Sequence, residues 1–183
     1  MKGPKTLETR RLLMRKPAMG DAQTIFERYA GDAAVTRYMS WPTHRTISDT
    51  AAFLAWSDAD WELWPAGSYL IFSRENTHLL LGGTGLAFRT PEFAVTGYVL
   101  AQDAWGQGFA TEALQAMVDL ARSLGVKRLE AVCHAEHRPS AHVMEKCGFQ
   151  SEGILRSHTE FPNLSPGARS DVLSYAIEMN GSK

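Results

Sequence analysis

The chain has 183 residues, 44% of them hydrophobic and 21% charged, so its length and composition suit a single globular domain with one core. Its formal net charge is −1 and no run approaches the ~18 apolar residues of a membrane span, so we expect neither nucleic acid nor a membrane as a partner. Two cysteines, Cys133 and Cys147, are too few for a disulfide framework, and the charged first 15 residues lack the apolar region of a signal peptide, which together predict a cytoplasmic protein.

The first part of the chain predicts one strand and two helices. A short strand covers residues 12–14, between pairs of basic residues. Asp21 is a good N-cap for a helix that ends at Gly31, because apolar residues follow it at helical spacing. A second helix begins near residues 46–48 and is stopped by the Pro-Ala-Gly sequence at 65–67. Four tryptophans fall in this region: Trp41, Trp56, Trp61 and Trp64. They either line a substrate cleft or fill the core, and the core is the commoner place.

The remainder of the chain alternates between strands and helices. Three consecutive apolar or aromatic strands are predicted over residues 68–73, 78–88 and 94–101. Three later strands are predicted over residues 129–133, 154–156 and 172–177. An amphipathic helix runs from Gly108 to Gly125, and a shorter one covers residues 139–147. The strand–helix–strand unit in the middle predicts one parallel strand pair, because a right-handed crossover is the usual connection. We therefore predict an α/β (α+β) fold, with a mixed, mostly antiparallel central sheet of about six or seven strands and helices on both faces. A single domain is expected over residues 7–178.

The strongest chemical signal is a glycine loop between a strand and the amphipathic helix, which reads Trp105-Gly106-Gln107-Gly108-Phe109-Ala110-Thr111-Glu112. Glycine lets the backbone approach a ligand, and the free N–H groups and dipole at a helix start favour a phosphate or pyrophosphate. The loop lacks the third glycine of a dinucleotide fingerprint and the Gly-Lys-Ser/Thr of a P-loop. It is therefore either a different phosphate-binding loop or a tight turn that merely starts a helix.

Two sequence stretches resemble the GNAT acetyltransferases. The glycine loop, with residues 97–113 around it, resembles the family's coenzyme A loop, whose pattern is Arg/Gln-x-x-Gly-x-Gly/Ala; Gly108 and Ala110 match. Trp105 replaces the Arg/Gln, which is typical of the RimJ/RimL branch, the ribosomal-protein N-terminal acetyltransferases. The opening Leu7-Glu8-Thr9-Arg10-Arg11-Leu12-Leu13-Met14-Arg15 is similar to the Leu-x-Thr-x-Arg-Leu-x-Leu-Arg of the same branch. The resemblance covers about residues 7–177.

A third stretch, His137-Arg138-Pro139-Ser140 with residues 143–149 after it, resembles the family's Asn-x-x-Ser motif. His137 stands where the family has an Asn that contacts the coenzyme near its thiol arm, and an imidazole can also donate one hydrogen bond. Ser140 matches the family's serine, although a serine in the first turn of a helix can also act only as a cap. A metal site is not expected, because the Cys and His spacing nearby is not a standard zinc pattern.

The resemblance implies acetyl-CoA as the cofactor and direct attack of an amine on its thioester. It implies coenzyme contacts from the strand at 94–101, the glycine loop and the third stretch: Val99, Leu100, Ala101, Gln107, Gly108, Phe109, Ala110, Thr111, His137 and Ser140. Ser140 is further expected to pass a proton to the leaving thiolate.

The general base is harder to assign. Many GNAT enzymes carry a Glu on the fourth strand, but Val95 and Thr96 occupy that stretch here. Glu160 is the acidic residue nearest to where the RimJ/RimL branch often has a base, with Thr159 at the matching position, and His158 is an alternative. The missing carboxylate favours an acceptor that is already partly neutral near pH 7.5, such as a peptide α-amine.

The leading interpretation is an acetyl-CoA-dependent N-acetyltransferase that acts on a protein or peptide N-terminal α-amine or on a small-molecule amine, as a monomer or homodimer. One alternative is a non-catalytic acyl-CoA-binding GNAT domain, which His137 and the missing carboxylate motivate. Another is an antibiotic or polyamine acetyltransferase on the same fold, which would differ only in its acceptor pocket.

Overall fold

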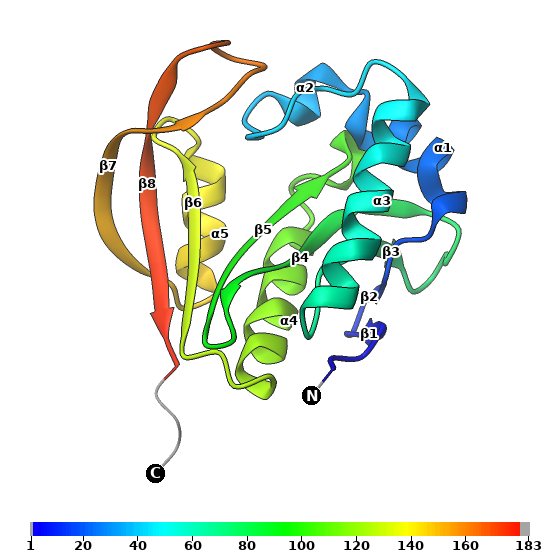
Figure 1. Ribbon diagram of the computed structural model, residues 1–183, viewed down its shortest axis with the longest axis horizontal. Helices are drawn as coiled ribbons and strands as arrows, with labels where there is room; N and C mark the ends of the chain where they lie inside the picture. Colours follow the sequence, from blue (N-terminus) through cyan, green and yellow to red (C-terminus); the bar gives the residue numbers. More distant parts are fainter. Residues whose placement is uncertain (1, 180–183) are drawn as a thin grey trace.

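The computed structural model describes residues 2–179, which contain an eight-stranded sheet of order β1-β2-β3-β4-β5-β6-β8-β7 (Figure 1). The strands are β1 Thr6–Glu8, β2 Leu12–Arg15, β3 Ser68–Ser73, β4 Leu80–Thr90, β5 Phe93–Leu100, β6 Arg128–His134, β7 Gln150–Glu160 and β8 Arg169–Glu178. Neighbours pair antiparallel except β5 and β6, which pair in parallel across the intervening α4. The mixed sheet is confirmed, with slightly more strands than predicted.

Helices cover both faces of this sheet, as predicted. They are α1 Ala22–Ile25, α2 Ala33–Thr36, α3 Ile47–Leu63, α4 Phe109–Ser123 and α5 Arg138–Lys146. Successive residues of β3 point to opposite faces. Leu70 packs in one buried cluster with Ile25 and Leu54 from the helices of the first third of the chain. Ile71 packs in the other, with Met117 of α4 and Met144 of α5. No helix within residues 2–179 is both long and apolar enough to cross a membrane.

The first predicted helix is shorter and more irregular than expected. A 3-10 turn at Met19–Asp21 leads into α1, and the chain continues through a π-helical turn at Phe26–Ala30. Asp21 does not cap a helix with its side chain. Its carboxylate accepts from the Ala18 N–H at 2.7 Å and pairs with Arg15 at 2.7 Å, so it closes the preceding turn instead. Asp21 is thus the N-cap residue of α1, as predicted, but it makes no side-chain cap bond because Arg15 on β2 and the Ala18 N–H engage its carboxylate.

Other differences lie where the sequence pattern is weak. β1 is three residues long, and α2 is a single turn capped by the Asp32 carboxylate, which accepts from the Ala34 N–H at 2.8 Å. β7 extends well beyond the predicted residues 154–156, but nearly all of it is exposed, so it has no apolar alternation to detect. Its pairing with β8 is also interrupted by two register shifts.

The feature that positions the site is the divergence of β5 from β6. The two strands pair only over Phe93–Arg128, Ala94–Leu129 and Val95–Glu130. Beyond Val95 they separate, as the opening between β5 and β6 in Figure 1 shows. Backbone groups on the facing edges are therefore not paired with each other past this point, and they remain available to a ligand.

Candidate functional site

A cleft of about 1260 Å³ opens where β5 and β6 diverge. The end of β5, around Tyr98 to Leu100, forms one side, and β6, at Ala131 to Cys133, forms the other. Trp105 and Gly106 of the glycine loop also line the cleft, as do residues at the start of α5. Aromatic side chains from the segment between α2 and α3 reach the cleft as well. Its size and largely apolar lining suit an extended organic ligand.

The glycine loop has the backbone shape of an anion site. Gly106 and Gly108 have φ of +71° and +79°, a left-handed conformation that favours glycine. Gly108 is the N-cap of α4 and offers no side-chain cap, and the bond from the Glu112 N–H to the Gly108 carbonyl closes the first turn. The N–H groups that precede Glu112 in this turn are left without helical acceptors. Together with the helix dipole, these N–H groups form a cradle that suits a phosphate or pyrophosphate.

Trp105, the residue that departs from the general GNAT pattern, holds this loop to the end of β5. Its indole Nε1–H donates to the Leu100 carbonyl oxygen at 2.8 Å, while half of its surface stays exposed. The bond fixes the point at which the chain leaves the strand and turns toward α4. A tryptophan therefore has a structural reason to occupy the position.

The structure brings only some of the predicted coenzyme residues to the cleft. Val99, Leu100, Ala110, His137 and Ser140 line it. Gly108 and Thr111 lie instead on a neighbouring groove between α4 and the β1–β2 turn, where Gln107 and Phe109 contact Arg11. Ala101 is buried, and its N–H donates to the Leu81 carbonyl at 2.8 Å, so this amide is committed to the sheet.

Ser140 lies in the first turn of α5, on the cleft wall. The residue at the N-cap is His137, which makes no side-chain cap bond, so a capping role for Ser140 finds no support in the geometry. The Tyr98 phenol and the Cys133 thiol are its neighbours. Burial raises the pKa of Tyr98 and raises the pKa of Cys133 to about 11, so both keep their protons at neutral pH.

Glu160 and His158 do not line the cleft, whereas Thr159 between them does. The Glu160 carboxylate accepts from the Gly167 N–H at 2.9 Å, within the loop that joins β7 to β8. The exposed His158 ring shares a hydrogen bond of 2.8 Å with the Thr159 hydroxyl. Because side chains alternate along a strand, residues 158 and 160 face away when residue 159 faces in. The structure therefore does not place either predicted base beside Ser140.

His137 lines the same cleft as Ser140, at the N-cap of α5. Its ring stacks on Tyr38, with 4.5 Å between the centroids. Burial lowers its pKa, and the neighbouring His134 lowers it further, so the imidazole is neutral at pH 7 and can both donate and accept. Within residues 2–179, no three His, Cys, Asp or Glu side chains are grouped closely enough to hold a metal ion.

Besides β5 and β6, a group of aromatic side chains lines the cleft, and the sequence alone identified only part of this aromatic wall. Tyr38 and Phe161 line it and both pack against His134, at 5.2 and 5.0 Å between ring centroids. Of the four tryptophans, Trp41 and Trp56 line the cleft. Trp61 is buried in the core and Trp64 stacks on Phe88 at the edge of that core, so both of the original interpretations apply, each to a different pair.

Asn163 joins the two segments that carry this aromatic wall. Its side-chain Nδ2 donates to the Thr36 and Trp41 carbonyl oxygens, at 2.8 and 2.9 Å. Its Oδ1 accepts from the Thr43 N–H at 2.8 Å. A single residue in the β7–β8 loop thus fixes the segment between α2 and α3. No local sequence signal marks this residue, because its partners lie about 120 positions away along the chain.

Comparison with known proteins agrees with this geometry. A family model described as an acetyltransferase (GNAT) domain matches residues 11–150. The chain is similar to the uncharacterized N-acetyltransferase p20 of Bacillus licheniformis, with 33% identity over 176 residues, 94% of this chain and 95% of that relative.

Two solved structures share the fold at lower identity. One is RimL, described as a ribosomal L7/L12 α-N-protein acetyltransferase in complex with coenzyme A, at TM-score 0.83, 21% identity and coverage of 97% of this chain and 99% of that chain. The other is the microcin C7 self immunity acetyltransferase MccE, in complex with acetyl-CoA and AMP, at TM-score 0.83, 22% identity and coverage of 96% and 97%.

Proposed function

The chain belongs to the GNAT acetyltransferase family, and we propose that it transfers the acetyl group of acetyl-CoA to a weakly basic primary amine, with a peptide α-amine as the leading acceptor. The predicted enzyme class and cofactor are confirmed by the family. The observation that carries the proposal on the acceptor is the lining of the cleft. Among the residues that the structure describes, Asp60 is the one carboxylate that lines the cleft. Asp60 lies near the end of α3, beside β3. Ser140 lies on α5, which packs beside β6, and β4 and β5 separate β6 from β3 in the sheet. Asp60 is therefore not next to Ser140, and no other carboxylate is among the described residues that line the cleft.

Acetyl-CoA supplies the activated acetyl thioester, and the protein's residues bind, orient and move protons. We propose that the N–H groups at the start of α4 hold the pyrophosphate. The unpaired edge of β5 beyond Val95 would hold the arm that carries the thioester. The Ser140 hydroxyl would donate a proton to the departing sulfur, and the neutral His137 ring would orient the arm or accept a proton through water.

The free energy needed to deprotonate the acceptor explains the preference for an α-amine. Neutralising an α-amine at pH 7.5 costs about 0.4 kcal/mol, against about 4 kcal/mol for a lysine side chain. An enzyme that lacks a carboxylate base gains most from an acceptor that is already partly neutral. The likeness to RimL, described as an α-N-protein acetyltransferase, supports the same choice, while the MccE structure with AMP keeps a small-molecule amine as the second candidate.

Peptides with a free N-terminus and no lysine are expected to be acetylated at least about a hundredfold faster, in kcat/KM, than peptides with a blocked N-terminus and one lysine. The measurement is acetyl transfer from acetyl-CoA, with mass spectrometry to locate the product. Lysine acetylation with free N-termini ignored would contradict the proposal. Polyamines and aminoglycosides in the same screen test the antibiotic or polyamine alternative, and coenzyme binding without turnover on any amine would point to the non-catalytic one.

The Asn163 contacts make a separate prediction about the acceptor side. Asn163→Ala removes four hydrogen bonds to the end of α2 and the segment that follows it, so the aromatic wall loses its support. We expect the KM for the acceptor to rise about tenfold, since each lost bond is worth roughly 0.5–1.5 kcal/mol and part is regained through water. The dissociation constant of coenzyme A should not change. Asn76→Ala, in the β3–β4 turn, is the control, and an unchanged acceptor KM in Asn163→Ala would refute the prediction.

We propose a single catalytic domain over residues 7–178 that works as a monomer or homodimer. We also propose a cytoplasmic location, because Cys133 and Cys147 are both buried free thiols, as in a reducing compartment.

A further inference from the structure

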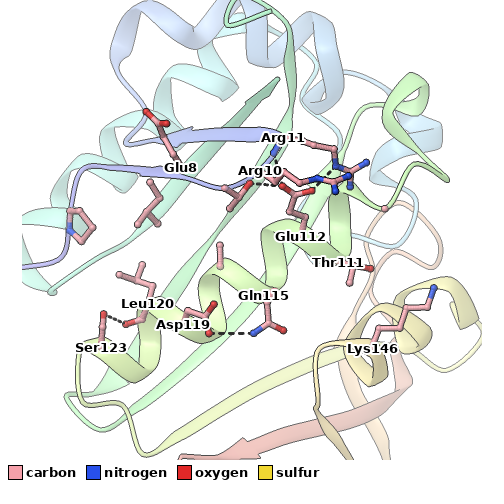
Figure 2. A pocket seen from close by; sticks show the side chains of 15 residues that line it. Glu8, Arg10, Arg11, Thr111, Glu112, Gln115, Asp119, Leu120, Ser123 and Lys146 are labelled. Atoms are coloured by element: carbon pink, nitrogen blue, oxygen red, sulfur yellow. Dashed lines mark hydrogen bonds and ion pairs between the residues drawn. The ribbon is translucent and has the colours of Figure 1, made fainter. Parts of the chain in front are cut away.

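Arg11 lies in the turn between β1 and β2 and reaches across to the start of α4 (Figure 2). We propose that Arg11 is a positioning residue that holds the glycine loop in the conformation that binds the coenzyme. The inference rests on the proposed use of this loop for the pyrophosphate.

Arg11 contacts three parts of the loop at once. Its Nη1 donates to the Gln107 carbonyl oxygen at 2.9 Å, between the two glycines of positive φ. Its Nε donates to the Glu112 carboxylate at 2.7 Å, and its backbone N–H donates to the other oxygen of that carboxylate at 2.8 Å. The guanidinium also lies over the Phe109 ring, 4.6 Å from its centroid. A planar guanidinium with several fixed donors can hold such a set of partners together, which a flexible ammonium cannot.

Glu112 gives the contact an electrostatic purpose. It is the acidic residue in the first turn of α4, close to where the pyrophosphate is proposed to bind, so an unpaired charge there would repel the ligand. Arg11 engages this carboxylate from the side of the β1–β2 turn (Figure 2), and the Thr9 hydroxyl in the same turn donates to it at 2.6 Å. Burial alone would raise the pKa of Glu112, but the hydrogen bonds from Thr9 and Arg11 outweigh burial and keep that pKa below its usual value. The carboxylate therefore stays ionised and needs Arg11 as its counter-charge.

Arg74, which follows β3, provides a matched control because it contacts the same β1–β2 turn. Its Nη1 donates to the Thr9 carbonyl oxygen at 2.8 Å, and its Nη2 pairs with Glu8 at 3.3 Å. Within residues 2–179, the Arg74 side chain makes no hydrogen bond or ion pair with the glycine loop. If the β1–β2 turn mattered only as a structural support, replacing either arginine would have the same effect.

The test measures the dissociation constant of coenzyme A by calorimetry for the wild type, Arg11→Met, Arg11→Lys, Glu112→Gln, the double variant Arg11→Met/Glu112→Gln, and Arg74→Met. We expect Arg11→Met to weaken binding on the order of tenfold or more, because it leaves a carboxylate without its partner beside an anion site. Arg11→Lys should recover part of the loss. The double variant should bind more tightly than Arg11→Met, since the repelling charge is gone, and Arg74→Met should stay within about twofold of the wild type.

Wild-type affinity in Arg11→Met would overturn the inference, as would a double variant weaker than Arg11→Met, which would show two independent contributions. An equal loss in Arg74→Met would assign the effect to the turn as a whole and overturn it as well. Should Arg11→Met fail to fold, Arg11→Lys decides the question, because it keeps a cation beside Glu112 but lacks the planar set of donors and should still weaken binding; wild-type affinity in Arg11→Lys would then overturn the inference. A wild type that does not bind coenzyme A would refute the proposed function itself, whatever the variants do.

Discussion

Replacing Gly108 by valine is expected to abolish coenzyme A binding while the protein remains folded. Gly108 has φ of +79° and sits at the N-cap of α4, where its amide neighbours face the proposed pyrophosphate. A Cβ there would lie 3.3 Å from the Arg11 Nη2, so a β-branched side chain crowds the guanidinium that holds the loop. The loop must then either shift or take up a strained left-handed valine.

The size of the effect follows from the bonds that are lost. A hydrogen bond to a charged group contributes about 1.5–3 kcal/mol, so losing two loop amides weakens binding by roughly a hundredfold or more. Calorimetry with coenzyme A measures the affinity, and thermal unfolding followed by circular dichroism confirms that the variant is folded. Left-handed strain of about 1–2 kcal/mol is tolerable for a domain whose stability is typically ~5–15 kcal/mol.

Gly125→Val is a matched control for the strain. Gly125 also has φ of +79°, at the other end of α4, and nothing lies within 4 Å of the position that its Cβ would occupy. The two valine variants should therefore lose similar stability, but only the one at Gly108 should lose the ligand. Undiminished affinity in Gly108→Val, or an equal loss of affinity in Gly125→Val, would show that the loop does not hold the pyrophosphate.

Ser140→Ala is expected to lower kcat by about a hundredfold with little change in coenzyme affinity. A general acid contributes ~10²–10⁴ in rate, and the lower end applies because a thiol of pKa ~8.5 is already a tolerable leaving group. The hydroxyl lines the cleft, and the partly buried Tyr98 and the buried Cys133 beside it keep their own protons, which is why we propose that Ser140 delivers one to the departing sulfur.

Steady-state turnover and calorimetry on the same preparation separate chemistry from binding. Ser123→Ala on α4 is the control, because the Ser123 hydroxyl donates to the Leu120 carbonyl at 2.7 Å and does not reach the cleft. A kcat unchanged in Ser140→Ala, in an assay where product release is shown not to limit the rate, would remove Ser140 from the chemistry. A parallel loss of coenzyme affinity would assign it to binding instead.

The sequence by itself determined the elements whose signals are local. The amphipathic stripe and closing glycine of α4 lie within one short segment, and so do the breaker after α3 and the glycine loop, so each could be predicted from residue spacing alone. The parallel pairing of β5 with β6 also followed, because a crossover helix leaves few other topologies. The same local motifs carried the family resemblance, and with it the enzyme class and the cofactor.

The tertiary structure alone decided which residues share the cleft. β5 and β6 separate after Val95, and no residue pattern in either strand predicts where their pairing ends. The alternation of β7 places Thr159 on the cleft and turns His158 and Glu160 away, which depends on register shifts that sequence spacing does not reveal. The hydrogen bonds from Arg11 to Glu112 and from Asn163 to Trp41 each join residues more than 100 positions apart. Such contacts are created by the folding of the chain and not by proximity in the sequence.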